Sequence, residues 1–307
     1  MEQEFTQEKF RQVGIRKDMG KTQSYKVRTY WGDVLWQITH NKISLFASVV
    51  IVLIILFAVF VPVFSPYSYK EVDMANTFVS PCLAHPFGTD DLGRDIMTRC
   101  AQGTRISLLV ALVAVVLDVG IGVTYGLISG YFGGMADLLM QRFVEIISGI
   151  PTMVIVTLLL LVMKPGVGSI VIALAMTGWI NMSRIVRAQM LKQKSMEYVM
   201  AAHTLGEKNR KIMLSEILPN TIGQIIITFM FTIPNAIFFE AFLAFIGLGV
   251  QAPMASLGSM INDGYKSAMM YPYMVFTPCL VLGLLMLCFN LLADGLKEAI
   301  DPQMKNM

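Results

Sequence analysis

The sequence has 307 residues, of which 55% are hydrophobic and 15% are charged, and its mean hydropathy is +0.62. These values exclude a soluble globular protein and predict an integral membrane protein that resides in a lipid bilayer. The net charge of +3 is small, so we expect no nucleic-acid partner.

Residues 1–43 are predicted to form a cytoplasmic N-terminal segment. About forty mostly polar residues precede an apolar run that is itself long enough to span a bilayer, so we do not expect a cleaved signal peptide. Tyr30, Trp31 and Trp36 lie among basic residues, a pattern that suits a short helix at the inner headgroup surface. An ordinary basic flank before the first span is the alternative.

Apolar segments of roughly 20 residues, the length that crosses the hydrocarbon core, occur six times. The six predicted spans are 44–64, 106–129, 138–163, 169–190, 222–250 and 273–293. We therefore predict an all-α membrane protein with a first helix at 44–64, an external loop at 65–104, a core of five helices at 105–295 that contains a polar loop at 191–221, and a tail at 296–307.

The distribution of lysine and arginine predicts the orientation. With the N-terminus inside, 18 of these residues lie on the inner side and six on the outer side. Because basic residues accumulate in cytoplasmic loops, both termini and the loop at 191–221 are predicted to be cytoplasmic.

The most informative segment is the polar stretch 197–220 between two apolar runs. Its apolar positions follow the spacing i, i+3, i+4 and i+7, at Tyr198, Ala201, Ala202 and Leu205. This spacing predicts a helix with one narrow stripe, and the two alanines would let another backbone approach closely. Gly206 is placed to end this helix with a left-handed cap, and Pro219 suits the first turn of the next helix.

Two features inside the predicted spans invite a functional reading. Gly122, Gly126 and Gly130 recur every four residues, which permits close helix contact and indicates packing above all. Glu240 is an ionisable group at membrane depth and is therefore a candidate for the translocation path. The alternative is a protonated or hydrogen-bonded side chain that braces the bundle near Pro234.

We find no motif for catalysis or for a cofactor. In the segment 14–22, five residues separate the glycines, whereas a phosphate-binding loop has four. The three histidines lie in separate regions without ligand spacing, so no metal site is expected. A disulfide between Cys82 and Cys100 on the outer side is conceivable, but cysteines near a membrane are commonly small apolar side chains.

Several segments together resemble the permease subunits of binding-protein-dependent ABC importers, in the oligopeptide, dipeptide and nickel branch. They are the stretch at 197–220, which is similar to the cytoplasmic EAA loop, the external segments 85–95 and 103–108, and the segment 240–251 with Pro253, Ser256 and Gly258. The resemblance extends from about Trp31 to Pro302. The long first external loop suits the second, C-type, permease of such importers.

The resemblance implies a type I importer fold with six spans in a bacterial cell (inner) membrane. It implies a second homologous permease as heterodimer partner, two ATPase subunits that carry ATP and Mg, and a substrate-binding protein outside the cell or in the periplasm. No catalytic activity and no cofactor are implied for this chain. The loop would form a coupling helix in a groove of the ATPase, with apolar contacts from Ala201, Ala202 and Leu205 and an ion pair from Glu197, beside Tyr198 and the turn at Gly206.

Three positions depart from the family pattern. Met200 stands where a glutamate usually precedes the paired alanines, Glu216 stands where this branch often has histidine, and Leu257 replaces a tryptophan. Docking would therefore depend more on shape and on Glu197 than on a charge at Met200.

The alternating charges of the outer loop leave two interpretations. They are Asp90, Asp91, Arg94 and Asp95, which we expect to lie over about one and a half helical turns. They either pair locally or meet the binding protein.

The substrate and even the class of transporter have alternatives. An oligopeptide is favoured, while a dipeptide or nickel importer of the same family is the nearest rival. A secondary transporter would work without an ATPase, but it would be expected to show repeat-related halves around a midplane site. A membrane subunit without a transport path could also carry the loop.

Overall fold

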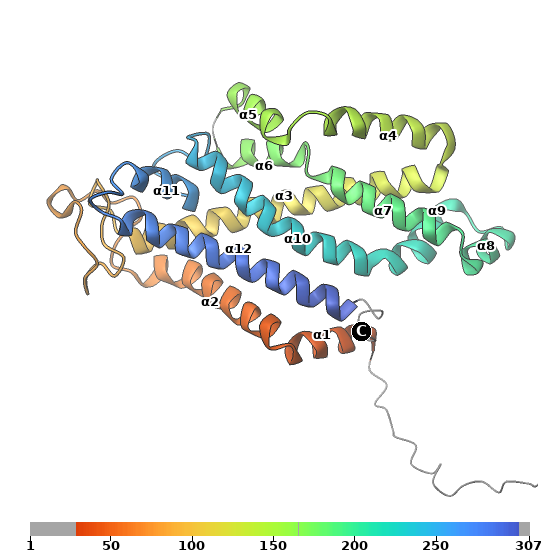
Figure 1. Ribbon diagram of the computed structural model, residues 1–307, viewed down its shortest axis with the longest axis horizontal. Helices are drawn as coiled ribbons and strands as arrows, with labels where there is room; N and C mark the ends of the chain where they lie inside the picture. The colour runs from red at the N-terminus through yellow and green to blue at the C-terminus, as the bar shows by residue number, and fades with distance from the viewer. Residues whose placement is uncertain (1–28, 165, 301–307) are drawn as a thin grey trace, which may run out of the picture.

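The computed structural model describes residues 29–164 and 166–300, and in these residues it is helical, with one isolated β-bridge between Thr89 and Asp95 in place of any sheet. The first part of the predicted N-terminal segment, the end of the tail and the glycine pair at 14–22 lie outside the described residues. The helices are α1 (Tyr30–His40), α2 (Lys42–Phe64), α3 (Ile96–Phe132), α4 (Gly134–Ser148), α5 (Thr152–Val162), α6 (Val167–Ala175), α7 (Trp179–Lys194), α8 (Glu197–Thr204), α9 (Asn209–Lys211), α10 (Leu218–Phe245), α11 (Leu257–Tyr265) and α12 (Tyr273–Ile300), as Figure 1 labels them.

Five helical segments of the described chain are long and apolar enough to cross a membrane, and a bent pair makes a sixth. The bent pair is α4 and α5, which meet at 78° and take the place of the single predicted span 138–163. Gly149 and Pro151 lie at the bend. Proline has no N–H for the helix ladder and disfavours the α conformation of the residue before it, so the helix is interrupted here. α6 and α7 together form one span, with a short interruption at 176–178.

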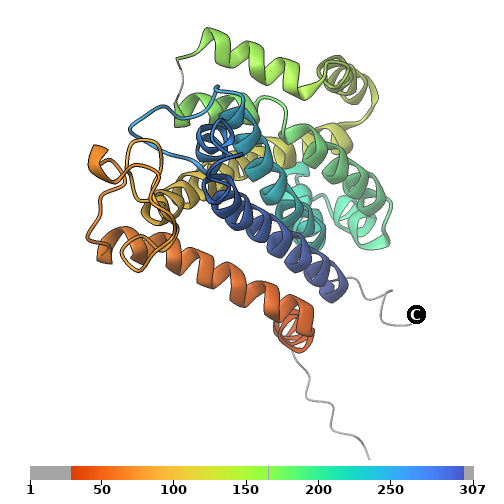
Figure 2. The ribbon, with the colours of Figure 1, turned by 60° about the vertical axis from the view of Figure 1, so that its left-hand side comes forward.

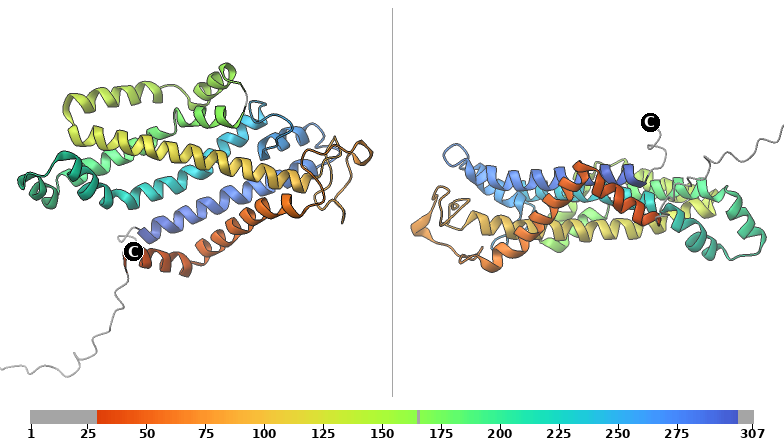
Figure 3. Two further views of the ribbon diagram at one scale, coloured as in Figure 1. Left: turned by 180° about the vertical axis from the view of Figure 1, so that it is seen from behind. Right: turned by 90° about the horizontal axis from the view of Figure 1, so that it is seen from below.

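The small residues of α3 bring it against α7, as the glycine spacing predicted. A Cβ added to Gly122, Gly126 or Gly130 would lie 2.5–2.7 Å from atoms of α7, closer than any side chain tolerates. α3 runs along most of the length of the bundle (Figure 3). The backbone of α3 therefore lies directly against backbone and side-chain atoms of α7, which is the packing interpretation of the glycine stripe.

The remaining helices cover the two sides of this pair. α2 and α12 lie on one side of α3, and the bent pair of α4 and α5 lies on the opposite side, as Figure 2 shows. α1 lies across the ends of α2 and α12, with Val34 buried and Trp31, Leu35 and Trp36 exposed. This division fits a helix at the headgroup surface.

The two ends of the bundle are formed by different segments of the chain. The segment between α2 and α3 lies with α11 at one end, whereas α1, α8 and the end of α12 lie at the other (Figure 1). The structure thus gathers at one end the segments that the charge bias predicts to be cytoplasmic.

Candidate translocation site and coupling helix

α8 projects beyond the neighbouring helices at the predicted cytoplasmic end (Figures 1 and 3). Val199 and Ala202 are buried in an apolar cluster with side chains of α3, α7 and the segment before α10. Leu205 is 84% exposed and Met200 is 52% exposed, and Glu197 and Ala201 are exposed with them. The predicted stripe is therefore divided between two faces: Ala202 packs inward against its own chain, and Leu205 faces outward.

Tyr198 fastens α8 to its neighbours. Its hydroxyl donates a hydrogen bond to Gln193 Oε1 (2.6 Å) on α7 and accepts one from Asn220 Nδ2 (3.3 Å) on α10. A side chain with both contacts fixes the orientation of α8 relative to α7 and α10.

The predicted left-handed cap at Gly206 is confirmed. Gly206 has a φ of +79°, its N–H donates to His203 O (3.0 Å), and the Glu207 N–H donates to Ala202 O (3.2 Å). This pair of bonds is the Schellman motif, which satisfies the last carbonyl groups of a helix. No heavy atom lies within 4 Å of an added Cβ, so the backbone conformation alone calls for glycine.

The helix that follows begins earlier than Pro219 suggested. α9 starts at Asn209 and leads through a π-helical segment at Ile212–Ile217 into α10, which has Pro219 in its first turn. Proline cannot donate to the carbonyl four residues before it, and wider i→i+5 bonding is one way for a helix to accommodate that loss.

A cavity of about 320 Å³ lies between α3, the α4–α5 bend, the α6–α7 interruption and α10. Its polar lining comes from Asp118, Ser148, Thr152, Thr177, Asn181, Arg184, Thr232 and Asn235. Phe239 and Leu174 add apolar surface. A cavity of this size and mixed polarity is typical of a ligand site.

Glu240, the predicted path candidate, is fully buried and is not part of the cavity lining. Ser107 Oγ on α3 donates a hydrogen bond to its Oε2 (2.6 Å). This bond joins α3 to α10, so the geometry corresponds to the bracing alternative.

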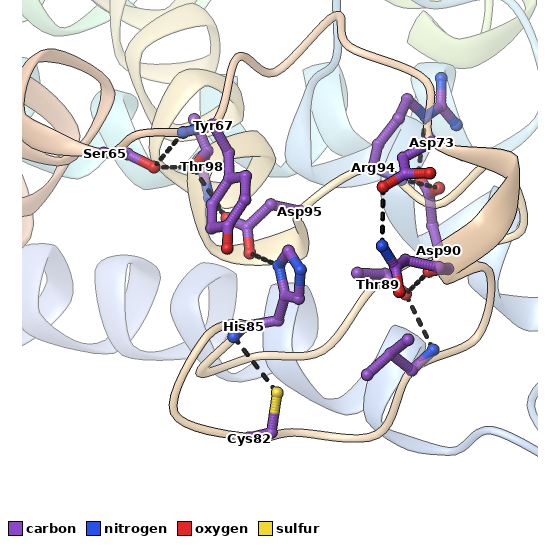
Figure 4. A network of polar contacts seen from close by, with 12 residues as sticks. Ser65, Tyr67, Asp73, Cys82, His85, Thr89, Asp90, Arg94, Asp95 and Thr98 are labelled. Atoms are coloured by element: carbon purple, nitrogen blue, oxygen red, sulfur yellow. Dashed lines mark hydrogen bonds and ion pairs between the residues drawn. The ribbon is translucent and has the colours of Figure 1, made fainter.

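The outer charges pair locally, and they lie in a turn before α3 and not on a helix (Figure 4). Asp90 Oδ2 accepts a hydrogen bond from Arg94 Nε (2.7 Å) and is also paired with Arg99. Asp95 caps α3, with Oδ2 accepting from the Thr98 N–H (2.8 Å). Only Asp91 exposes about half of its side chain.

A second contact of this loop involves Asp95 and the segment around Cys82. His85 Nδ1 lies 3.0 Å from Asp95 Oδ1, and the His85 ring lies 4.4 Å from the Tyr67 ring (Figure 4). Cys82 is exposed and Cys100 is buried, and both are free thiols here.

Asp73 forms further contacts within the loop between α2 and α3. The Asn76 side chain donates to its carboxylate (2.7 Å), and this bond, with a further one from the Ala75 N–H, lowers the pKa of Asp73. Gly93 has a φ of +71°, and a Cβ there would lie 1.8 Å from the Asp73 carbonyl oxygen. The turn at 90–95 therefore packs against the segment before it at backbone distance.

Residues 122–306 match the family described as binding-protein-dependent transport system inner membrane component. The chain belongs to this family. Residues 29–86 also match the N-terminal transmembrane domain of oligopeptide transport permease C.

Curated relatives of the permease cover most of its length. It is 44% identical to the oligopeptide transport system permease protein OppC of Bacillus subtilis, over 92% of both chains. It is 42% identical to the dipeptide transport system permease protein DppC of the same organism, over 90% of this chain and 87% of that one. Its relatives are thus transport permeases.

Solved structures confirm the fold of the permease. The inward-facing MetNI methionine ABC transporter matches with a TM-score of 0.55 at 16% identity, over 67% of this chain and 98% of that chain. An amino acid ABC transporter matches with a TM-score of 0.51 at 20% identity, over 65% of this chain and 92% of that chain. The predicted importer-permease fold follows from these matches, while the multi-pass location in the inner membrane follows from the family match and the apolar helices.

Asp118 is the functional candidate that sequence reasoning missed. It lies four residues before Gly122 on α3, and it is an ionisable group inside a span, the same signal that singled out Glu240. Its carboxylate lines the cavity of the permease, which the Glu240 carboxylate does not.

Proposed function

We propose that this chain is a permease subunit of an ATP-driven importer of oligopeptides. Support for the substrate comes from the oligopeptide and dipeptide permeases to which it is similar over most of its length. In this proposal it forms half of the path with a second, homologous permease, two ATPase subunits bind ATP and Mg, and a binding protein delivers the peptide from outside.

α8 is the proposed coupling helix. The observation that carries this role is the exposure of Leu205 and Met200 on a helix that ends in a fixed glycine turn. We propose that Leu205, Met200 and Ala201 fill an apolar groove of the ATPase, while Glu197 pairs with a basic residue at the edge of the groove. Ala202 lies on the face of α8 that packs against α3, α7 and the segment before α10, so it holds α8 in place and does not contact the ATPase.

The proposed docking surface for the binding protein is likewise limited to the exposed side chain of the outer loop. Asp90, Arg94 and Asp95 are buried in local contacts, so their role is to shape the loop. Asp91, which is exposed beside them, is the acidic side chain that we propose meets the binding protein.

Reconstitution tests the function directly. The chain, its partner permease, the ATPases and the binding protein are placed in liposomes, and uptake of a labelled tripeptide is measured. We expect uptake only when ATP, both permeases and the binding protein are all present. Uptake by this chain alone along an ion gradient would overturn the proposal in favour of a secondary transporter, and ATP-dependent uptake of nickel without peptide uptake would reassign the substrate.

A further inference from the structure

The cavity is bordered by two helix interruptions and by a proline inside α10. Ser148 and Thr152 flank the α4–α5 bend, Thr177 and Gly178 belong to the α6–α7 interruption, and Asn235 follows Pro234 inside α10. Interrupted helices at membrane depth are tolerated only where the freed backbone groups are buried in protein or line a water-filled cavity. Two helix interruptions and one helical proline around this cavity therefore indicate a polar region within the bundle.

Asp118 faces this cavity without a partner. The residue is only 4% exposed, and its Oδ1 has no hydrogen-bond partner among the described residues. A Cβ added to Gly178 would lie 2.0 Å from Asp118 Oδ2. The absence of a side chain at Gly178 is thus what lets the carboxylate lie against the interruption between α6 and α7.

Asp118 forms no ion pair with any basic side chain of the described residues. Arg184, the basic residue of the lining, is exposed and donates to Ser148 Oγ (2.9 Å). By contrast, the fully buried Glu240 accepts a hydrogen bond from the Ser107 hydroxyl at its Oε2, although its Oε1 has no partner among the described residues. A buried carboxylate without a counter-ion is unfavourable in its charged form, so a cationic ligand group would supply the interaction that the site lacks.

We propose that Asp118 binds the primary ammonium group of a peptide as it passes through the cavity. A primary ammonium is a compact cation with three N–H donors, which suits a carboxylate recessed beside a glycine. Such a group is present at the amino terminus of a peptide and on a lysine side chain. The proposal rests on the peptide-importer function and adds to it the residue and the group that it recognises.

The test uses the complete transporter in liposomes, with peptide-loaded binding protein outside and ATP within reach of the ATPases. The probes are trialanine, N-acetyl-trialanine and N-acetyl-Ala-Lys-Ala. The variant is Asp118→Asn, and the control is Glu145→Gln, which removes an acid that is paired with Arg142 at the surface of α4. Assembly and ATP hydrolysis without peptide are measured for each variant.

We expect Asp118→Asn to lower trialanine uptake at least about tenfold relative to uptake of N-acetyl-trialanine, because one partner of a buried charge pair is removed. Asp118→Glu should keep most of this discrimination, and Glu145→Gln should leave it unchanged. If uptake of N-acetyl-Ala-Lys-Ala falls as well, the site accepts any primary ammonium; if it does not, the site is specific for the amino terminus.

Gly178→Ala is a second test that does not depend on assembly of the asparagine variant. It keeps the charge, but the added methyl group displaces the carboxylate, so the same selective loss of trialanine uptake is expected. An equal fall for trialanine and N-acetyl-trialanine, or no change in either variant, would overturn the role of Asp118. If the wild-type complex transports none of the three peptides, the proposed function itself fails, and this inference fails with it.

Discussion

The predicted outer and inner ends of the permease are stabilised by different interactions. At the outer end, Asp90, Arg94 and Arg99 are buried and depend on one another for charge compensation. At the inner end, α8 is held by the apolar side chains of Val199 and Ala202 and by a glycine turn. Removing one member of a buried ion pair leaves the other charge uncompensated and is strongly destabilising. Truncating an apolar side chain lowers stability in proportion to the contacts that are lost. The outer loop is thus expected to be rigid, whereas the exposed side chains of α8 are expected to tolerate substitution without loss of the fold.

The largest loss of stability is expected from Asp90→Ala. This change leaves two buried arginines without their shared carboxylate, and breaking a buried ion pair costs about 3–5 kcal/mol. Thermal unfolding of the purified complex measures the loss. The neighbouring Asp91→Ala, whose side chain is half exposed, should change stability by less than about 0.5 kcal/mol. Equal effects of the two changes would show that the outer end is not held by its buried charges.

Gly206→Val should have a smaller effect that is confined to the inner end. A left-handed conformation costs a residue with a Cβ about 1–2 kcal/mol, and the open space around Gly206 excludes a clash as the cause. We expect loss of ATPase from the purified complex and loss of peptide uptake, with insertion of the permease unchanged. Gly206→Asn is the matched control, since asparagine adopts this conformation more readily. Normal ATPase retention by the valine variant would contradict the role of the turn.

Leu205→Ser should have the smallest effect on stability and a clear effect on docking. The side chain is 84% exposed, so the permease alone should unfold as before, within about 0.5 kcal/mol. Burying a leucine in a partner contributes about 1.5–3 kcal/mol, so affinity for the ATPase should fall roughly tenfold or more. Leu191→Ser, at an exposed leucine of α7, controls for the loss of apolar surface. Equal ATPase affinity of the Leu205 variant and the wild type would remove α8 as the docking helix.

The features that could be predicted from the sequence are those determined by a few neighbouring residues. Gly206 ends α8 because the positive φ is a local property of that turn. The glycine spacing of α3 predicted close packing because residues four apart share one face of a helix. Span positions followed from long apolar runs, and even there the bend at Pro151 was missed because the apolar run continues through it.

The features that could not be predicted depend on contacts between distant segments. Whether Ala202 or Leu205 faces inward depends on where the π-helical segment before α10 lies. Asp90 pairs with Arg99, nine positions along the chain, and Arg99 also donates a hydrogen bond to Asp263 on α11. The cavity at Asp118 exists only once four separate segments have packed, so no local pattern could have separated Asp118 from Glu240.

The backbone contact between α3 and α7 has a mechanical consequence. Lys194 Nζ, at the end of α7, donates to Tyr131 O (2.5 Å), and the Tyr131 hydroxyl donates to Asn209 Oδ1 (2.8 Å) just beyond α8. Because the glycine face of α3 has no side chains, α7 packs closely on it, and the two hydrogen bonds join this pair of helices to the chain that carries α8. We therefore expect a displacement of α8 to be passed on to α3, the helix on which Asp118 lies.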